Sequence, residues 1–157
     1  MTEPLRIKPH HLLDIIRDFG AGVVHQPHPY GHDVHRIARI VREHPGTVFE
    51  LTAAADSICA PCRCLVEDHC TDTTTSPGSE VSKESWNRTI DGRIFERLGL
   101  AEGEKISALE FCRLARRRLG DLFTLYAEVE RSKTSLRHKN LERGLQEYLE
   151  SANPGKE

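Results

Sequence analysis

The sequence lacks the features of an exported, membrane-spanning or nucleic-acid-binding protein. No apolar run approaches the roughly 20 residues that a membrane-spanning helix needs, and no hydrophobic signal segment opens the chain. The formal net charge is only −2, so no positive surplus indicates a nucleic-acid partner. We therefore expect a cytoplasmic protein without a membrane or nucleic-acid partner, and 157 residues suffice for a core of ordinary size.

Cysteine is scarce, with five residues, but four of them lie in the single run CAPCRCLVEDHC. Small secreted scaffolds spread an even number of cysteines along the chain, so disulfide bonding explains this cluster poorly. Soft thiolates select zinc, copper(I) or iron–sulfur clusters, and short spacers let one stretch of backbone surround a single centre. The pattern therefore predicts a metal centre with Cys59, Cys62, Cys64 and Cys70 as its ligands.

The spacing leaves three kinds of cysteine site open. A structural zinc would use Cys59 and Cys62 as one knuckle and Cys64 and Cys70, with His69 beside them, as a cramped second. A thioredoxin-like dithiol is suggested by CAPC after a strand, but that fold needs later strands and the C-terminal half has a helical pattern. An iron–sulfur cluster fits dense, irregular thiolates. Spacing alone does not choose between zinc and iron.

A second group of polar residues lies near the start of the predicted first helix. His10 and Asp14 are four apart and His11 and Asp14 are three apart, so both imidazoles can flank the carboxylate on one helical face. Such a group could ligate a metal, or the imidazoles could orient a ligand and move protons. A surface or capping pair would explain the same spacing.

Hydrophobic periodicity predicts a mainly α fold with a minor β element, in which helices pack around a short strand and a cysteine-rich metal loop. The β-branched residues 47–52 predict that strand, and the cysteine loop follows it. Residues 71–79 are polar and predict a surface loop, while Asp91-Gly92 predicts a helix break. The remaining expectations are a short strand at 5–7 and helices that begin at Pro9, after an Asp33 cap and after a Ser107 capping box.

Two amphipathic segments follow Gly120, with residues 131–135 predicted as the turn between them. We expect a metal-binding domain over residues 1–120 and a helical extension over 121–157 that packs on this domain or on a partner chain. The leucines and tyrosine at helical spacing in the extension favour a homodimer through these helices.

Three motifs, taken in order, resemble a known family. The runs LRIKPHHLL at 5–13, SICAPC at 57–62 with the later Cys70, and DGRIFERLGL at 91–100 are similar to the bacterial and archaeal family called domain of unknown function 1284. The resemblance covers roughly residues 5 to 120. Members of that family are described as iron–sulfur-binding proteins, so the resemblance implies a cluster but no reaction.

One position departs from the family pattern, in which a cysteine follows the paired histidines and leucines. This chain has Asp14 there, and it has the additional Cys64. Two fourth ligands are therefore open beside the other three cysteines: the Cys64 thiolate, or the Asp14 carboxylate. A closed four-thiolate centre suits structure or electron transfer, whereas a carboxylate ligand would leave one iron exchangeable and able to act as a Lewis acid.

The sequence therefore predicts an iron–sulfur protein, with a 4Fe–4S cluster as the expected cofactor and zinc as the alternative. As an enzyme, it would activate a small oxygen- or sulfur-containing substrate at an open iron, with His10 and His11 as acid–base residues. As a non-catalytic module, it would hold a structural zinc or exchange electrons with a redox partner. The sequence specifies neither the substrate nor the cluster nuclearity.

Overall fold

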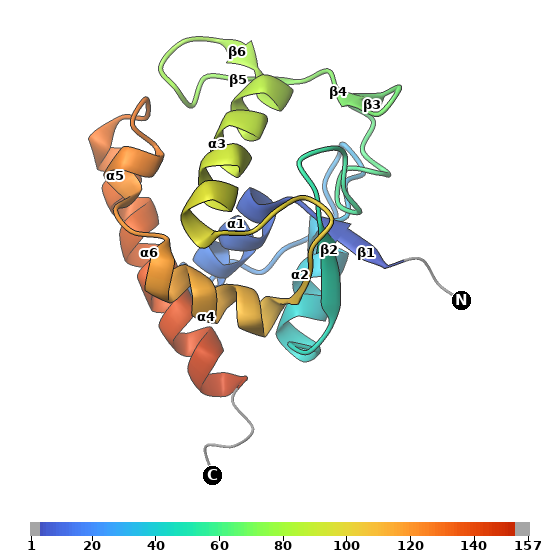
Figure 1. Ribbon diagram of the computed structural model, residues 1–157. Helices are drawn as coiled ribbons and strands as arrows, with labels where there is room; N and C mark the ends of the chain where they lie inside the picture. Colours follow the sequence, from blue (N-terminus) through green and yellow to red (C-terminus); the bar gives the residue numbers. More distant parts are fainter. Residues whose placement is uncertain (1–3, 153–157) are drawn as a thin grey trace.

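The computed structural model describes residues 4–152, which form six helices and three small sheets (Figure 1). This confirms the predicted mainly α fold with a minor β element. The helices are α1 (Pro9–Gly20), α2 (Val34–Glu43), α3 (Lys83–Leu98), α4 (Ala108–Arg118), α5 (Leu122–Leu125) and α6 (Arg131–Ser151). The strands are β1 (Leu5–Ile7), β2 (Val48–Leu51), β3 (Leu65–Val66), β4 (His69–Cys70), β5 (Thr73–Thr74), β6 (Val81–Ser82) and β7 (Lys105–Ser107).

The main sheet has the order β1-β2-β7, with β1 parallel and β7 antiparallel to β2. Ile7 and Leu51 are paired across the first ladder, and with Phe49 they are fully buried, as alternation along a half-buried strand requires. Lys8 joins β1 to α1, and Pro9 occupies the first helical turn, where a missing N–H costs nothing. The sheet therefore fixes the position of the first turn of α1.

Helix α6 packs along α1 so closely that the two backbones touch (Figure 1). A Cβ atom on Gly144 would lie 2.0 Å from the carbonyl oxygen of Ile16, and one on Gly20 would lie 1.9 Å from that of Asn140. Only glycine fits at either position. Helix α1 is thereby enclosed between the sheet, α3 and α6, and its residues Leu12, Leu13, Ile15 and Ile16 are buried.

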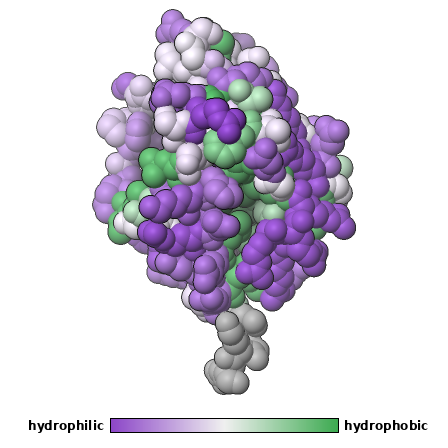
Figure 2. All heavy atoms as spheres, turned by 90° about the vertical axis from the view of Figure 1, so that its left-hand side faces the viewer, coloured by the Kyte–Doolittle hydropathy of each residue, from purple (hydrophilic) through white to green (hydrophobic). Residues whose placement is uncertain are grey.

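The apolar stripe of α6 is buried within the chain. Leu141, Leu145, Tyr148 and Leu149 all belong to the core, and the Tyr148 hydroxyl donates to the Val41 carbonyl at 2.7 Å. Figure 2 shows the outer face over α5 and α6, where hydrophilic side chains predominate. These four residues are therefore covered within the chain, whereas Leu136 on the same helix is exposed, and the homodimer stays a prediction. Among residues 4–152, none of the helices has the length and hydrophobicity that crossing a membrane requires.

The predicted turn at 131–135 is wrong, because α6 begins at Arg131. This segment has no glycine or proline to interrupt a helix, and Thr134 is buried against the core. The predicted loop over 71–79 is also wrong in part, because Thr73–Thr74 pairs with Val81–Ser82 as a two-stranded ladder. A two-residue strand forms only where a second strand pairs with it, and here that second strand lies after the predicted loop. The hydrophobic periodicity of one segment does not reveal such a pairing.

Of the two helix caps predicted from the sequence, Ser107 forms its cap and Asp33 does not. The Ser107 capping box is confirmed, since the Ser107 hydroxyl accepts from the Glu110 amide at 3.1 Å. Asp33 does stand before α2, but its carboxylate accepts from the Arg36 side chain at 2.6 Å and caps no amide. The predicted break at Asp91-Gly92 is wrong, because α3 continues through both residues. The Asp91 side chain is buried against α1 instead of bonding to its own backbone.

Candidate metal centre

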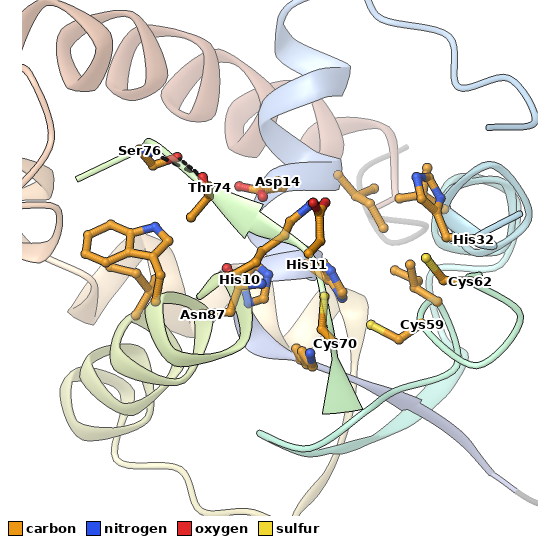
Figure 3. Close-up of a pocket in the computed structure, with 18 of the residues that line it drawn as sticks. His10, His11, Asp14, His32, Cys59, Cys62, Cys70, Thr74, Ser76 and Asn87 are labelled. Carbon is orange, nitrogen blue, oxygen red and sulfur yellow. Dashed lines mark hydrogen bonds and ion pairs between the residues drawn. The ribbon is translucent and has the colours of Figure 1, made fainter. Parts of the chain in front are cut away.

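A cavity of about 350 Å³ lies between the first turns of α1 and the cysteine loop (Figure 3). All the residues predicted from the sequence as ligands or catalytic groups line it, together with residues that the sequence did not single out. Those predicted residues are His10, His11, Asp14, Cys59, Cys62, Cys64 and Cys70. They come from α1, from the loop after β2 and from β4.

Tight turns bring the cysteines of the loop together. The Cys62 amide donates to the Cys59 carbonyl at 2.8 Å, which closes a turn between the first two thiols. Further on, β3 and β4 form a hairpin whose central residues Glu67 and Asp68 have φ values of 51° and 65°, as the favoured two-residue hairpin turns require. This hairpin returns Cys70 opposite Leu65, next to Cys64.

Asp56 organises the start of this loop, although the sequence analysis did not identify it. One carboxylate oxygen accepts from the amides of Ile58 and Cys59, both at 3.0 Å. The other accepts from the Lys8 amide at 2.8 Å and from Nδ1 of His11 at 2.7 Å. Burial raises the pKa of Asp56, but His11 and the amide donors outweigh it and hold this pKa well below its ordinary value.

His11, Asp56 and Cys59 form a group that could hold a metal ion, since one ligand atom of each lies within 4.8 Å of the others. Both Asp56 oxygens already accept two hydrogen bonds each, so this carboxylate fits the role of an orienting partner. A carboxylate that binds Nδ1 of a metal-ligating histidine fixes the ring and leaves Nε2 for the metal. Figure 3 shows the His11 ring beside Cys59 and Cys70.

His10 is held by a second buried carboxylate. Its ring Nδ1 lies 2.9 Å from both oxygens of Asp91, and its backbone amide donates to the same carboxylate at 2.8 Å. Burial lowers the pKa of His10, yet the charge and hydrogen bond of Asp91 outweigh burial and leave this pKa raised. The His10 and His11 rings lie 4.3 Å apart, and within residues 4–152 no hydrogen bond engages Nε2 of either.

Asp14 lines the same cavity but is bound by two arginines. Its carboxylate accepts from Arg137 at 2.6 Å and lies 3.3 Å from a nitrogen of Arg17. Burial raises the pKa of Asp14, but the two guanidinium groups outweigh it and lower this pKa to about 2. The carboxylate is therefore ionised at neutral pH and its charge is already matched on the protein.

Two of the four thiols, Cys59 and Cys64, have pKa values above the ordinary range for cysteine. Burial, and then the nearby charge of Asp56, raise the pKa of Cys59 to about 12. Desolvation and the neighbouring Cys62 and Asp72 likewise raise the pKa of Cys64. A redox-active dithiol requires the opposite shift, so the thioredoxin-like interpretation finds no support here. A bound metal supplies the positive charge that deprotonates such thiols.

The structure also brings His32 to the cavity, although the sequence did not single it out. Its Nδ1 is buried and has no hydrogen-bond partner within residues 4–152, and its ring stacks on His28 with centroids 4.3 Å apart. Figure 3 shows His32 on the Cys62 side of the cavity. His69, by contrast, does not line the cavity and binds Glu84 at 3.0 Å. His32 follows a glycine- and proline-rich segment, residues 20–31, which has no periodic pattern that could indicate a buried histidine.

No family model, curated protein or solved structure matches this chain. The resemblance to domain of unknown function 1284 therefore stays a prediction. The cavity lined by the cysteines and histidines is therefore the basis for a proposed function.

Proposed function

We propose that this protein binds an iron–sulfur cluster, with Cys59, Cys62, Cys64 and Cys70 as the ligands. One observation carries the proposal: these four thiols line a single cavity of about 350 Å³ together with His10 and His11. Iron–sulfur clusters are held by four thiolates, and the cavity supplies that number. The donor set fits the group, because cysteine sulfur is the soft ligand that iron–sulfur clusters take.

Cys64, and not Asp14, is the better fourth ligand. The Asp14 carboxylate lies between Arg137 and Arg17, and moving it to a metal would leave both guanidinium groups without their partner. Cys64 has no such engagement and stands beside Cys70 through the β3–β4 hairpin. All five cysteines of the described residues are free thiols, which fits the reducing cytoplasm where we propose that the protein works.

The histidines support an enzymatic role at this centre. A bound cluster would supply electron transfer or Lewis acidity to a small oxygen- or sulfur-containing ligand. His10 and His11 have Nδ1 fixed by Asp91 and Asp56, so Nε2 of each can give or take a proton in the cavity. An electron-transfer module would need neither of these two buried carboxylate–histidine pairs.

A single zinc ion is the second candidate, and the His11, Asp56 and Cys59 group supports it. Anaerobic purification followed by iron, sulfide and zinc analysis and a visible spectrum distinguishes the two. We expect iron and sulfide in comparable amounts and a brown colour, whereas stoichiometric zinc in a colourless sample would support the alternative. Metal-free protein whose thiols all titrate without loss of structure would overturn both.

Matched variants then test the ligand set. Cys64→Ala should lose metal, while Asp14→Ala should keep it. Cys112→Ala is the control, because Cys112 is buried in the core and does not line the cavity. Metal loss in Asp14→Ala with full retention in Cys64→Ala would contradict the proposed fourth ligand.

A further inference from the structure

Lys8 is a buried lysine with no ion-pair partner. Its side chain and backbone together are only 5% exposed, and it lines the cavity of the cysteines. Within residues 4–152, no carboxylate forms an ion pair with its ammonium group, although Asp56 binds its backbone amide. Its ammonium nitrogen is not among the buried polar atoms that lack a hydrogen-bond partner, so we take its charge to face the cavity that Lys8 lines.

The other cationic residues of the cavity wall are neutralised by carboxylates. Arg137 and Arg17 bind Asp14, and Lys83 lies 3.5 Å from Asp72. Lys8 is thus the cavity cation whose charge remains unmatched within the described residues. An anion that enters the cavity would meet this charge on a partly apolar wall, where water screens the attraction less than on an open surface.

Two imidazoles stand next to Lys8 on the same short stretch of chain, and Nε2 of such a ring donates to an anion when the ring carries both protons. Lys8 precedes α1, and His10 and His11 lie in its first turn with Nε2 free of hydrogen bonds within residues 4–152. Because Asp91 and Asp56 hold the two rings from the opposite side, neither imidazole needs to be reoriented to receive a ligand.

We propose that the cavity binds a small organic anion, a carboxylate or a phosphate, whose charged group is anchored by Lys8 and bonded by His10 and His11. The inference names the ligand class of the proposed metal centre, and it rests on that proposal for the chemistry that follows binding. The anion would lie beside the cysteines, where a metal could polarise it.

The space next to Asp14 has room and aromatic surface for a flat ligand body. A second cavity of about 350 Å³ adjoins the first and shares part of its wall. The shared residues are Arg17, Asp18, Ser76, Trp86, Tyr126 and Arg137. Trp86 and Tyr126 provide aromatic surface against which a flat group can pack. An aromatic carboxylate therefore matches the site better than a compact inorganic anion.

Benzoate and benzamide test the inference directly, because they have the same shape and differ in charge. Calorimetric titration of the anaerobically purified protein should show binding of benzoate and, more weakly, of inorganic phosphate, but none of benzamide. Equal binding of benzoate and benzamide, or no binding of either anion, would overturn the inference.

Three lysine variants locate the anion. Lys8→Met should weaken benzoate binding by about tenfold or more, Lys8→Arg should retain most of it, and Lys139→Met, which removes an exposed lysine outside both cavities, should leave it unchanged. Benzoate affinity that is unaffected in Lys8→Met would contradict the proposal.

Metal analysis of the same samples separates this inference from the proposed function. Metal-loaded wild type that binds neither anion would refute the anion site alone. Metal-free wild type that still binds benzoate through Lys8 would support the anion site and contradict the metal centre. If Lys8→Met loses its metal, and benzoate competes with metal loading in wild type, then Lys8 neutralises the thiolates and the inference fails.

Discussion

The amide and the imidazole of His10 both bond to the carboxylate of Asp91, although the two residues are 81 positions apart. Asp91 is fully buried in the middle of α3, and the contact joins α3 to the first turn of α1. It therefore fixes one wall of the cavity and one of the two candidate proton carriers at once.

Asp91→Ala should lower the free energy of unfolding by about 3 kcal/mol, because it leaves His10 and its amide buried without their acceptor. Urea unfolding followed by circular dichroism measures the change. Glu147→Ala, which removes an exposed carboxylate from α6, should change stability by less than about 0.5 kcal/mol. Equal effects of the two substitutions would show that the buried contact contributes nothing.

Gly144→Ala should destabilise the protein by about 3 kcal/mol, because the new methyl group would lie 2.0 Å from the Ile16 carbonyl oxygen and would push α6 away from α1. Gly92→Ala is the matched control, since Gly92 is an exposed glycine within α3 whose added methyl group meets nothing within 4 Å. That substitution should stabilise by about 0.5 to 1 kcal/mol. Thermal melting of both variants checks the opposite signs.

Asp56→Asn should weaken metal binding by about tenfold to a hundredfold, because an amide cannot accept all four hydrogen bonds that orient His11 and the Cys59 turn. Competition with a chelator measures the affinity. Asp68→Asn, at the exposed hairpin turn, should leave the affinity unchanged. Unaltered metal affinity in Asp56→Asn would remove this residue from the site.

Asp14→Asn should remove part of the acid sensitivity of the fold. The pKa of Asp14 is about 2 in the folded protein against 3.8 in its ordinary state, so its ion pairs stabilise the fold above about pH 4. That stabilisation, on the order of 1 kcal/mol for a partly exposed pair, is lost as the pH falls through about 2.

Unfolding free energies at several pH values between 2 and 7 measure this effect. The difference between wild type and Asp14→Asn should shrink as the pH falls from 4 to 2. Glu142→Gln, at an exposed position of α6, should show a small difference that does not depend on pH in this way. A constant difference for Asp14→Asn would refute the interpretation.

Local rules predicted the elements whose causes are local. Proline at the start of α1 and serine before α4 act within one turn of chain, and both were found from the sequence. The cysteine cluster was also recognisable, because soft ligands at short spacing have few other uses.

Asp91 and Lys8 could not be identified in this way. The importance of Asp91 depends on His10, which lies in another helix, and the importance of Lys8 depends on the absence of a partner in the folded chain. The sequence does indicate part of the role of Asp56, because an aspartate at the start of a turn often accepts hydrogen bonds from the amides two and three residues later. Asp56 accepts in this way from Ile58 and Cys59. Its contact with His11 required the structure.

The close contact between Gly20 and Gly144 lets α6 hold in place the helix that carries the two histidines, α1. His10, His11 and Asp14 share α1 with Gly20, so we expect a displacement of α6 to disturb the helix that carries these residues. Arg137, about two turns before Gly144, adds a second attachment between the helices through Asp14. A ligand that displaced α6 would thus also shift the two imidazoles of α1. A chain shortened to its first 120 residues would lack α6 and leave α1 without this support.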